Sequence, residues 1–292
     1  MNDIKSVKRL IQKLLHDSGY YLLKYQKALS RYQPDQEWES RIIDAVECKD
    51  NIYIPRVANA GIVDGRYQIM HNGLKILLGS YYGYGYTRLL ERNKGVHEPQ
   101  EERVFREVLK YIPAGATMIE LGSFWAFYSM WFHSEIENAQ CYMVEPEYIN
   151  MLKGRSNFKH NNFKGTFINA FVGKSGVPTR PTPTISIDDL VKTKGIERVH
   201  ILHSDIQGAE FEMLQGAKSV LSSKIVDYVF VSTHSNELHI QCELFLKEYN
   251  FEIIASANLD ESFSVDGILV AKHNGVPGPG FIHIDLKQHL II

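Results

Sequence analysis

The spacing of apolar residues changes along the chain, and its first segment, residues 3–32, is predicted to be a helix. Apolar side chains recur there three and four positions apart, which places them on one face. They are Ile4, Val7, Leu10, Ile11, Leu14 and Leu15, and Pro34 ends the segment. Because other faces are basic, we expect the helix either to pack on its own protein or a second subunit, or to lie on a membrane surface.

Residues 52–79 follow an extended pattern with one strong turn signal. Apolar runs at 67–71 and 74–78 flank Asn72-Gly73, a dipeptide typical of a hairpin whose two turn residues both have positive φ. Residues 79–86 then place four tyrosines among three glycines, which predicts a flexible aromatic loop. Such a loop suits a sugar or a planar ligand, and an ordinary surface loop is the alternative.

From about residue 96 onward, predicted strands alternate with predicted helices. Repeating βα units imply a mainly parallel sheet with helices on both faces, so the expected fold class is α/β, doubly wound and Rossmann-like. The last two strands are close enough in sequence to form an antiparallel pair. The strands are expected at 117–121, 140–145, 167–172, 199–203, 226–232, 251–255 and 267–271, and the helices at 99–111, 126–135, 148–157, 188–192, 209–221 and 237–249.

Composition argues against several classes of protein. The 292 residues carry 32 Lys and Arg against 34 Asp and Glu, a net charge of −2, whereas nucleic-acid binders usually have a basic excess. No apolar run approaches the ~20 residues of a membrane span, and no secretory signal follows Met1, so we expect a cytoplasmic protein. Three widely spaced cysteines, Cys48, Cys141 and Cys242, match neither a disulfide framework nor a CxxC zinc pattern.

Candidate chemistry is concentrated where the predicted strands end, because ligands of such sheets bind at the carboxyl ends of the strands. The first strand ends in Glu120-Leu121-Gly122-Ser123, with one glycine in place of the three in a dinucleotide-binding loop. This disfavours a pyrophosphate and an NAD-dependent dehydrogenase, whereas Glu120 would attract a cation. Glu145 ends the second strand, 25 residues further on, where an acid typically accepts hydrogen bonds from ribose hydroxyls. A cationic nucleoside without phosphate fits both acids, and S-adenosylmethionine is the obvious candidate.

Residues 95–272 resemble the FkbM-type methyltransferases, a branch of the class I S-adenosylmethionine-dependent enzymes. The resemblance rests on segments 95–101, 119–123 with 127–129, 144–146, 169–173, 184–190 and 203–210, of which TISIDDL at 184–190 and HSDIQGAE at 203–210 are the most distinctive. It implies O-methylation of a small or glycan-linked hydroxyl. The predicted contacts of S-adenosylmethionine are Glu120, Gly122, Ser123, Glu145, Asn169, Ala170 and Asp205.

The sequence departs from the family pattern in two loops. Ala126, after the bulky Phe124 and Trp125, stands where relatives commonly have a second glycine, and Gln207 stands where they commonly have Glu. These departures keep open a nucleoside-binding scaffold without catalysis. The first 90 residues have no counterpart in the family pattern.

Two candidate catalytic residues follow neighbouring strands: Asp205 comes after the fourth strand and His234 after the fifth. A histidine titrates near neutral pH and suits a general base, with Asp205 orienting it or acting itself. Alternatively, Asp205 and His234, joined by His239, hold a divalent metal, and an imidazole ligand favours a transition metal over magnesium. A structural role for His234 is the third alternative. Glu210 and His203 are expected to be structural.

These interpretations divide the chain into three parts. Residues 1–94 form a helix and hairpin appendage on the acceptor side or for homo-oligomerisation, 95–275 a methyltransferase domain, and 276–292 a tail. The predicted reaction is S-adenosylmethionine-dependent O-methylation of a sugar, glycan or related small molecule, without nucleic acid as a partner. Methylation of a nitrogen on the same fold is the alternative.

Overall fold

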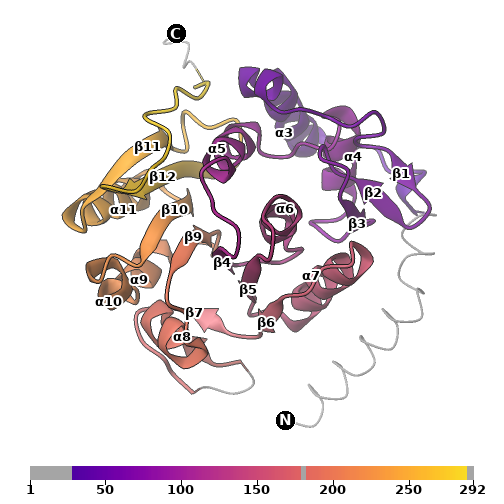
Figure 1. Ribbon diagram of the computed structural model, residues 1–292. Coiled ribbons are helices and arrows are strands. Elements are labelled where there is room, and N and C mark those ends of the chain that lie inside the picture. The colour runs from indigo at the N-terminus through magenta and orange to yellow at the C-terminus, as the bar shows by residue number, and fades with distance from the viewer. Residues whose placement is uncertain (1–27, 179–181, 288–292) are drawn as a thin grey trace.

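The structure is a computed structural model that describes residues 28–178 and 182–287 (Figure 1). The predicted helix over residues 3–32 lies outside the described residues except for its last positions, so its part in packing or oligomerisation stays a prediction. Within the described ranges, every helix lacks either the length or the apolar content that crossing a membrane requires.

A seven-stranded sheet forms the centre of the molecule. In spatial order its strands are β11 (Phe251–Ala257), β12 (Gly267–His273), β10 (Val226–Thr233), β9 (Val199–Ser204), β4 (Thr117–Leu121), β5 (Gln140–Val144) and β6 (Thr166–Ile168). β12 is antiparallel to both of its neighbours, and the other pairs are parallel. The predicted fold class, a mainly parallel sheet that closes with an antiparallel pair, is confirmed.

Helices cover both faces of this sheet (Figure 1). One face carries α5 (Pro99–Leu109), α6 (Phe127–Glu135) and α7 (Tyr148–His160), and the other carries α8 (Ile187–Lys194), α9 (Glu210–Gln215), α10 (Lys218–Ser222) and α11 (Asn236–Glu248). Consecutive strand residues point to opposite sides, so Met118 packs in the core beneath α5 and α6, while Ile119 packs in the core towards α8–α11. This burial on both faces explains the continuous apolar runs of the central strands.

Short polar signals in the sequence fix where the helices after the strands begin. The Ser186 side chain accepts a hydrogen bond from the N–H of Asp189 at the start of α8, and Ser235 does the same for Leu238 at the start of α11. Because Ser235 follows His234 directly, its cap fixes the turn that carries this candidate residue.

The N-terminal part packs onto the same core as the first helices of the sheet. It consists of α3 (Gln36–Glu47), the 3₁₀ helix η1 (Lys49–Tyr53), the small sheet of β1 (Val63–Asp64), β2 (Tyr67–Ile69) and β3 (Lys75–Leu77), and α4 (Tyr84–Arg92). Ile42, Met70 and Leu89 from this part share one apolar cluster with Phe105 and Phe127. The boundary at residue 94 stays a prediction, and it does not separate two hydrophobic cores.

The hairpin forms, but the prediction for its turn is wrong. β2 and β3 pair through Ile69 and Lys75, so residues 70–74 make the connection. Of the turn dipeptide, only Gly73 has positive φ, at 89°. Asn72 instead accepts a hydrogen bond from the N–H of Leu74 through its side-chain Oδ1, 3.2 Å away, which stabilises a longer turn.

The prediction of a flexible aromatic loop at 79–86 is also wrong for most of its length. Residues 84–86 begin α4, and the rings of Tyr81 and Tyr86 are buried. Tyr81 stacks on Trp125 with ring centroids 4.5 Å apart. Aromatic packing therefore overrides the flexibility that the glycines suggest, and it leaves Tyr82, 51% exposed, at the surface of this stretch.

Three other segments differ from the sequence pattern. The strand expected at 167–172 is interrupted, and its second half, β7 (Phe171–Val172), pairs instead with β8 (Thr184–Ile185). The helix expected at 209–221 is split at Gly216, where any Cβ would lie 2.3 Å from the carbonyl oxygen of Gly173. The tail is not a free linker as far as residue 287, since Ile282 is buried and bonds the backbone of Ile254.

Candidate active site

The loops after β4 and β9 cross in direct contact at the carboxyl edge of the sheet. Gly122 has φ +70°, and a Cβ placed on it would lie 1.7 Å from the carbonyl oxygen of Asp205. The N–H of Asp205 donates to the carbonyl of Leu121, 3.0 Å away. Only glycine fits this crossing, which holds Asp205 against the first loop.

The rest of the first loop adopts a left-handed backbone without glycine. Phe124 has φ 41° and Ala126 has φ 60° and ψ 40°, a region that side chains other than glycine seldom adopt. The glycine expected from the family pattern at Ala126 would relieve this strain. Gly154 of α7 makes room for the loop, since a Cβ there would lie 2.9 Å from the carbonyl oxygen of Phe124.

Glu145 closes the same loop from the neighbouring strand. It is 5% exposed, and its two oxygens accept hydrogen bonds from the backbone N–H groups of Phe124 and Glu147, at 3.0 and 2.7 Å. Asn169 lies beside it and donates to the carbonyl of Glu145 at 2.8 Å. Burial raises the pKa of Glu145, despite these hydrogen bonds. The structure therefore brings Glu145 and Asn169 together with the loop after β4.

The remaining predicted donor contacts are more deeply buried. Glu120 is 4% exposed and accepts a hydrogen bond from the N–H of Ser129, and burial raises its pKa to about 7. The Ser123 hydroxyl is buried without a hydrogen-bond partner among the described residues. Ala170 is fully buried in the core towards α8–α11, so its side chain contributes packing.

His234 lies among three carboxylates. Its Nε2 is 3.4 Å from Oδ1 of Asp205 and 3.2 Å from Oδ1 of Asp266, and its Nδ1 is 2.9 Å from Oε1 of Glu210. The His234 side chain is 17% exposed, and Asp205 and Asp266 are 21% and 15% exposed, so the group faces solvent at its edge. The predicted pair Asp205 and His234 is thus in contact, and two further acids, Glu210 and Asp266, also contact the imidazole.

The neighbouring charges determine the protonation states of His234 and Asp266. Burial opposes a charge on His234, but the hydrogen bonds to Asp205 and Glu210 and the charge of Asp266 outweigh it and raise its pKa to about 10. Burial and the nearby Asp205 raise the pKa of Asp266 to about 7, against the opposing effect of His234. The imidazole is therefore protonated at neutral pH, whereas Asp266 is close to its midpoint.

Asp205, His234 and Asp266 also form a group that could hold a metal ion. One ligand atom from each residue lies within 4.8 Å of the others. The structure corrects the expectation that His239 joins them: its two ring nitrogens lie 2.9 Å from the hydroxyls of Thr233 and Ser256. It is a buried residue of α11, held between Thr233 of β10 and Ser256 of β11.

Glu210 and Gln207 hold the loop after β9. Oε1 of Glu210 accepts hydrogen bonds from the N–H groups of Ile206 and Gly208, at 3.2 and 3.1 Å, as well as facing His234. Gln207, at φ 59°, donates its side-chain amide to Oδ1 of Asp205 at 3.0 Å. A glutamate at this position would place a second negative charge against Asp205, so the departure from the family pattern preserves a hydrogen bond here.

Buried contacts between histidines and carboxylates connect the N-terminal part to α5. Nε2 of His71 lies 3.2 Å from Glu102, whose other oxygen lies 2.6 Å from Nδ1 of His97, and Nε2 of His97 lies 3.1 Å from Glu98. Burial opposes a charge on His97, but Glu98 and Glu102 outweigh it and raise its pKa to about 10. A parallel pair joins α5 to β9, where Nε2 of His203 lies 2.5 Å from Glu101.

Sequence reasoning missed Asp266 at the site, whereas Tyr82 belongs to the aromatic stretch at 79–86 that it singled out for a sugar or a planar ligand. Asp266 directly precedes Gly267, the first residue of β12, so an acid ahead of the antiparallel strand was the available signal. The Tyr82 ring lies 5.2 Å from that of Phe124. Burial and then the charges of Asp205, Asp266 and Glu145 raise the pKa of Tyr82 to about 12. Its hydroxyl therefore lies in the field of all three acids.

The parallel sheet with its closing antiparallel pair and acids at the carboxyl edge is the arrangement expected of a class I methyltransferase. Residues 146–253 match the family model described as the methyltransferase FkbM domain. The resemblance to the FkbM-type methyltransferases that was predicted from the sequence is thereby confirmed over these residues. A search of curated proteins found no match for it.

Several solved structures are similar at low identity. TrmK from M. capricolum, in complex with S-adenosyl-homocysteine, is 12% identical, with 64% of this chain and 70% of that chain covered and a TM-score of 0.39. Precorrin-6y C5,15-methyltransferase from Geobacter metallireducens is 15% identical, with 59% and 86% covered and a TM-score of 0.41. Ribosomal protein L11 methylase from Lactobacillus delbrueckii subsp. bulgaricus is 10% identical, with 61% and 80% covered and a TM-score of 0.42.

Proposed function

We propose that this protein transfers the methyl group of S-adenosylmethionine to a hydroxyl oxygen of a sugar, glycan or related small molecule. The observation that carries the proposal is the convergence of Asp205, His234 and Asp266 beside the loop of Gly122, at the edge of the sheet where the donor is expected. A hydroxyl acceptor needs a group that takes its proton as the new C–O bond forms, and this cluster supplies one.

The donor is proposed to lie across the carboxyl ends of β4 and β5. Glu145 would accept hydrogen bonds from the ribose hydroxyls, with Asn169, Gly122 and Ser123 around it, and Asp205 would face the methyl group. Glu120 forms no ion pair among the described residues and feels only the field of His203, so the ammonium of the donor would find a largely uncompensated acid there. Backbone groups of the first loop complete the proposed pocket.

Asp266 is the group that we assign as the proton acceptor. The sequence favoured His234, but the three carboxylates around this ring keep it protonated at neutral pH, and an imidazolium cannot accept a proton. Asp266, 3.2 Å from Nε2 of His234, is the neighbouring acid whose pKa of about 7 suits a base. In the proposed step the donor S–CH₃ bond breaks, the acceptor O–CH₃ bond forms and the hydroxyl proton passes to Asp266, while His234 and Asp205 orient that carboxylate.

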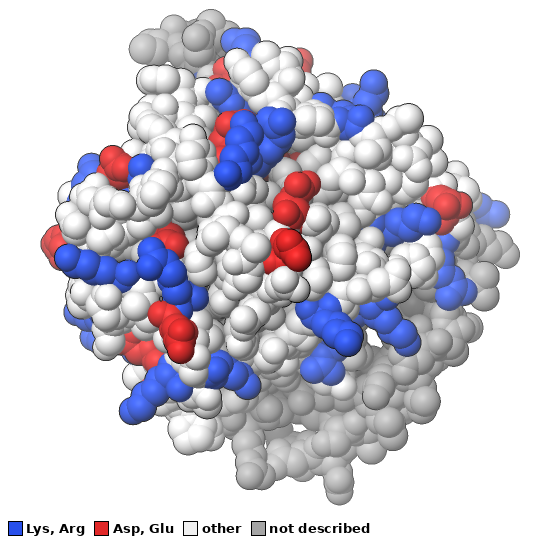
Figure 2. Space-filling view, in the orientation of Figure 1, with Lys and Arg blue, Asp and Glu red and all other residues white. Residues whose placement is uncertain are grey.

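Charge and aromatic surface favour a sugar-like acceptor over a nucleic acid. The site presents Asp205, Asp266 and Glu145, which repel phosphate groups. Tyr82 is half exposed beside Phe124 and offers a ring face with a hydroxyl, which suits a polyhydroxyl ring. On the face shown in Figure 2, basic and acidic side chains are interspersed and no wide basic area is present. An amine acceptor remains the alternative, because the same acids would also attract a cation.

A divalent metal is the second possibility for the same three residues. Asp205, His234 and Asp266 would hold it, and two carboxylates with one imidazole suit Mn²⁺ or another transition metal better than Mg²⁺. Such an ion would lower the pKa of a bound hydroxyl. It would compete with the proton of His234, so the metal form and the imidazolium form exclude each other.

The proposal is tested with methyl-labelled S-adenosylmethionine and a panel of free sugars, nucleotide sugars, glycans and amines. Labelled methyl ether on a sugar or glycan supports it, and label on nitrogen alone would overturn the oxygen assignment. Tight donor binding with no label transferred to any acceptor would favour the non-catalytic scaffold instead. A tRNA and rRNA arm tests the nucleic-acid alternative directly.

A further inference from the structure

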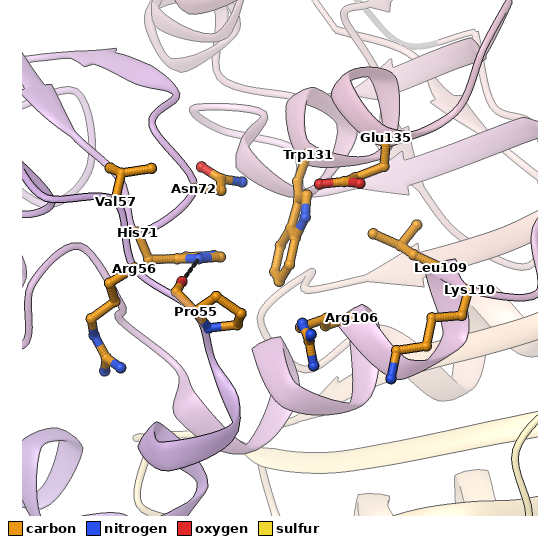
Figure 3. A pocket seen from close by; sticks show the side chains of 10 residues that line it. All are labelled: Pro55, Arg56, Val57, His71, Asn72, Arg106, Leu109, Lys110, Trp131 and Glu135. Atoms are coloured by element: carbon orange, nitrogen blue, oxygen red, sulfur yellow. Dashed lines mark hydrogen bonds between the residues drawn. The ribbon is translucent and has the colours of Figure 1, made fainter.

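A cavity lies between the N-terminal part and the C-terminal halves of α5 and α6 (Figure 3). Its volume is about 510 Å³, within the range of small-molecule pockets. α6 starts at the carboxyl edge of the sheet and runs back, so the cavity, which reaches Trp131 and Glu135, lies away from the candidate active site. None of the residues that line it is among those that we propose to bind S-adenosylmethionine or to accept the proton of the hydroxyl.

The cavity combines a flat apolar wall with charged groups at its rim. Trp131 lies in its centre in Figure 3, with Leu109 and Pro55 around it. Arg106 and Lys110, from the end of α5, lie on one side, and Glu135 lies across from them. Trp131 is 3% exposed, so a planar ring would pack against its small exposed part together with Pro55 and Leu109, and an anionic group would be drawn towards the two basic side chains.

A buried donor without a partner faces this space. Nδ2 of Asn72 has no hydrogen-bond partner among the described residues, although Oδ1 of the same side chain accepts from Leu74. In Figure 3 the Asn72 amide nitrogen points towards the space beside Trp131. Leaving such a donor unpaired costs about 1–3 kcal/mol. An acceptor oxygen of a ligand would satisfy it.

The other polar groups of the lining have different roles. The Arg56 guanidinium donates to Asn51 and to backbone carbonyls, and Nδ1 of His71 lies 3.3 Å from the carbonyl of Pro55. Nη1 of Arg106 donates to the Tyr53 carbonyl and to Glu107, and Nζ of Lys110 pairs with the other oxygen of Glu107. Asn72 is therefore the unpaired donor that a ligand would meet, and Arg106 and Lys110 would offer it the N–H groups that Glu107 does not use.

We propose that this cavity is a second ligand site, which takes a small planar, largely apolar molecule bearing one carboxylate. The ring packs on Trp131, and the carboxylate oxygens accept hydrogen bonds from Asn72 and from Arg106 or Lys110. One negative charge is favoured over a phosphate dianion because Glu135 lines the same cavity. The site is independent of the methyl-transfer proposal and does not rest on it.

Calorimetric titration of the full chain with 1-naphthoate tests the site. The protein is first saturated with S-adenosyl-homocysteine so that the probe cannot enter the donor pocket. We expect saturable binding of 1-naphthoate, and binding of the uncharged 1-naphthamide weaker by about tenfold or more, the worth of a charge-assisted hydrogen bond. Absence of saturable binding, or equal affinity for acid and amide, would overturn the proposal.

Two substitutions connect the binding to the named donors. Asn72→Asp keeps the acceptor for the Leu74 N–H but replaces the free donor with a negative charge, and Lys110→Gln removes one exposed cation. Each is expected to weaken 1-naphthoate binding by about tenfold or more, whereas Lys192→Gln, on exposed α8, leaves it unchanged. Unchanged affinity in both Asn72→Asp and Lys110→Gln, with the wild-type melting temperature retained, would show that the probe binds elsewhere.

Discussion

Gly122 and Asp205 lie so close that a Cβ on the glycine would be 1.7 Å from the carbonyl oxygen of the aspartate. This contact joins the loop after β4, where we propose that the methyl donor binds, to the loop after β9 that carries Asp205. The backbone of Asp205 cannot move away from the loop after β4 without breaking the hydrogen bond from its N–H to the carbonyl of Leu121. The two halves of the candidate site are therefore fixed to each other by backbone.

Gly122→Ala is expected to destabilise the protein by more than about 2 kcal/mol, because it adds a backbone clash to an unfavourable positive φ. Thermal unfolding measures this. The matched control is Gly195→Ala, which has a similar φ of +63° but no atom within 4 Å of the added Cβ. It should cost only the backbone strain, about 1–2 kcal/mol. Equal losses in the two variants would contradict the close crossing.

Glu145→Gln is expected to weaken S-adenosylmethionine binding by about tenfold or more, since a neutral amide accepts ribose hydrogen bonds less strongly than a carboxylate. Calorimetry gives the dissociation constant. The amide oxygen can still accept from one of the two N–H groups that Glu145 serves, so a melting curve checks the loop. Glu147→Gln, an exposed neighbour, is the control. Wild-type affinity in Glu145→Gln would remove this residue from the donor site.

The sequence was sufficient for the order of strands and helices because each buried strand carries a continuous apolar run and each turn has local signals. It also placed Asp205 and His234 in contact, because the carboxyl ends of neighbouring parallel strands meet at one edge. Element ends were less predictable where a side chain redirects the backbone. Asn169 interrupts its strand by bonding the carbonyls of Glu145 and Pro146.

Asp266 and the buried acids of α5 could not be found this way. Asp266 reaches His234 from the neighbouring antiparallel strand, where Gly267 pairs with Thr233, and the two residues are 32 apart in sequence. Glu101 and Glu102 suited the positive end of a helix dipole, yet they are buried against His203, His97 and His71. No local pattern distinguishes an exposed helix-capping acid from one that pairs with buried histidines of other segments.

The stability contribution of His234 is expected to disappear as the pH rises from 6.5 towards about 10. Its pKa is raised from 6.5 to about 10 in the folded protein, so its charge favours folding fully below 6.5 and progressively less above it. Urea unfolding across this range, in buffer with a chelator, should show wild type exceeding His234→Gln by a margin that shrinks with pH. His160→Gln is the control, because burial lowers the pKa of His160 below 6.5, so that this group gains no positive charge as the pH rises over the range. A constant margin would contradict the ion-pair assignment.

Chelation is expected to leave methyl transfer unchanged, because the imidazolium of His234 already supplies the positive charge between the acids. Turnover of the best acceptor from the labelled-donor panel is measured before and after removal of divalent ions. Activity lost on chelation and restored by Mn²⁺ would assign Asp205, His234 and Asp266 to a metal site instead. Asp205→Asn should then also abolish the Mn²⁺ response.

Asp266→Asn is expected to lower kcat by about 10²–10⁴-fold, the usual contribution of a positioned proton acceptor, while the donor dissociation constant stays within about twofold. The amide keeps the size of the side chain but cannot take the acceptor proton. Wild-type kcat should also rise as the pH passes through about 7, the pKa of Asp266, and this rise should be absent from the residual activity of the variant. Asp260→Asn, an exposed acid nearby, is the control. If Asp266→Asn retains wild-type kcat and its pH dependence, the proton is accepted by another group, and Asp205, 3.4 Å from the same imidazole nitrogen, is the acid to test next.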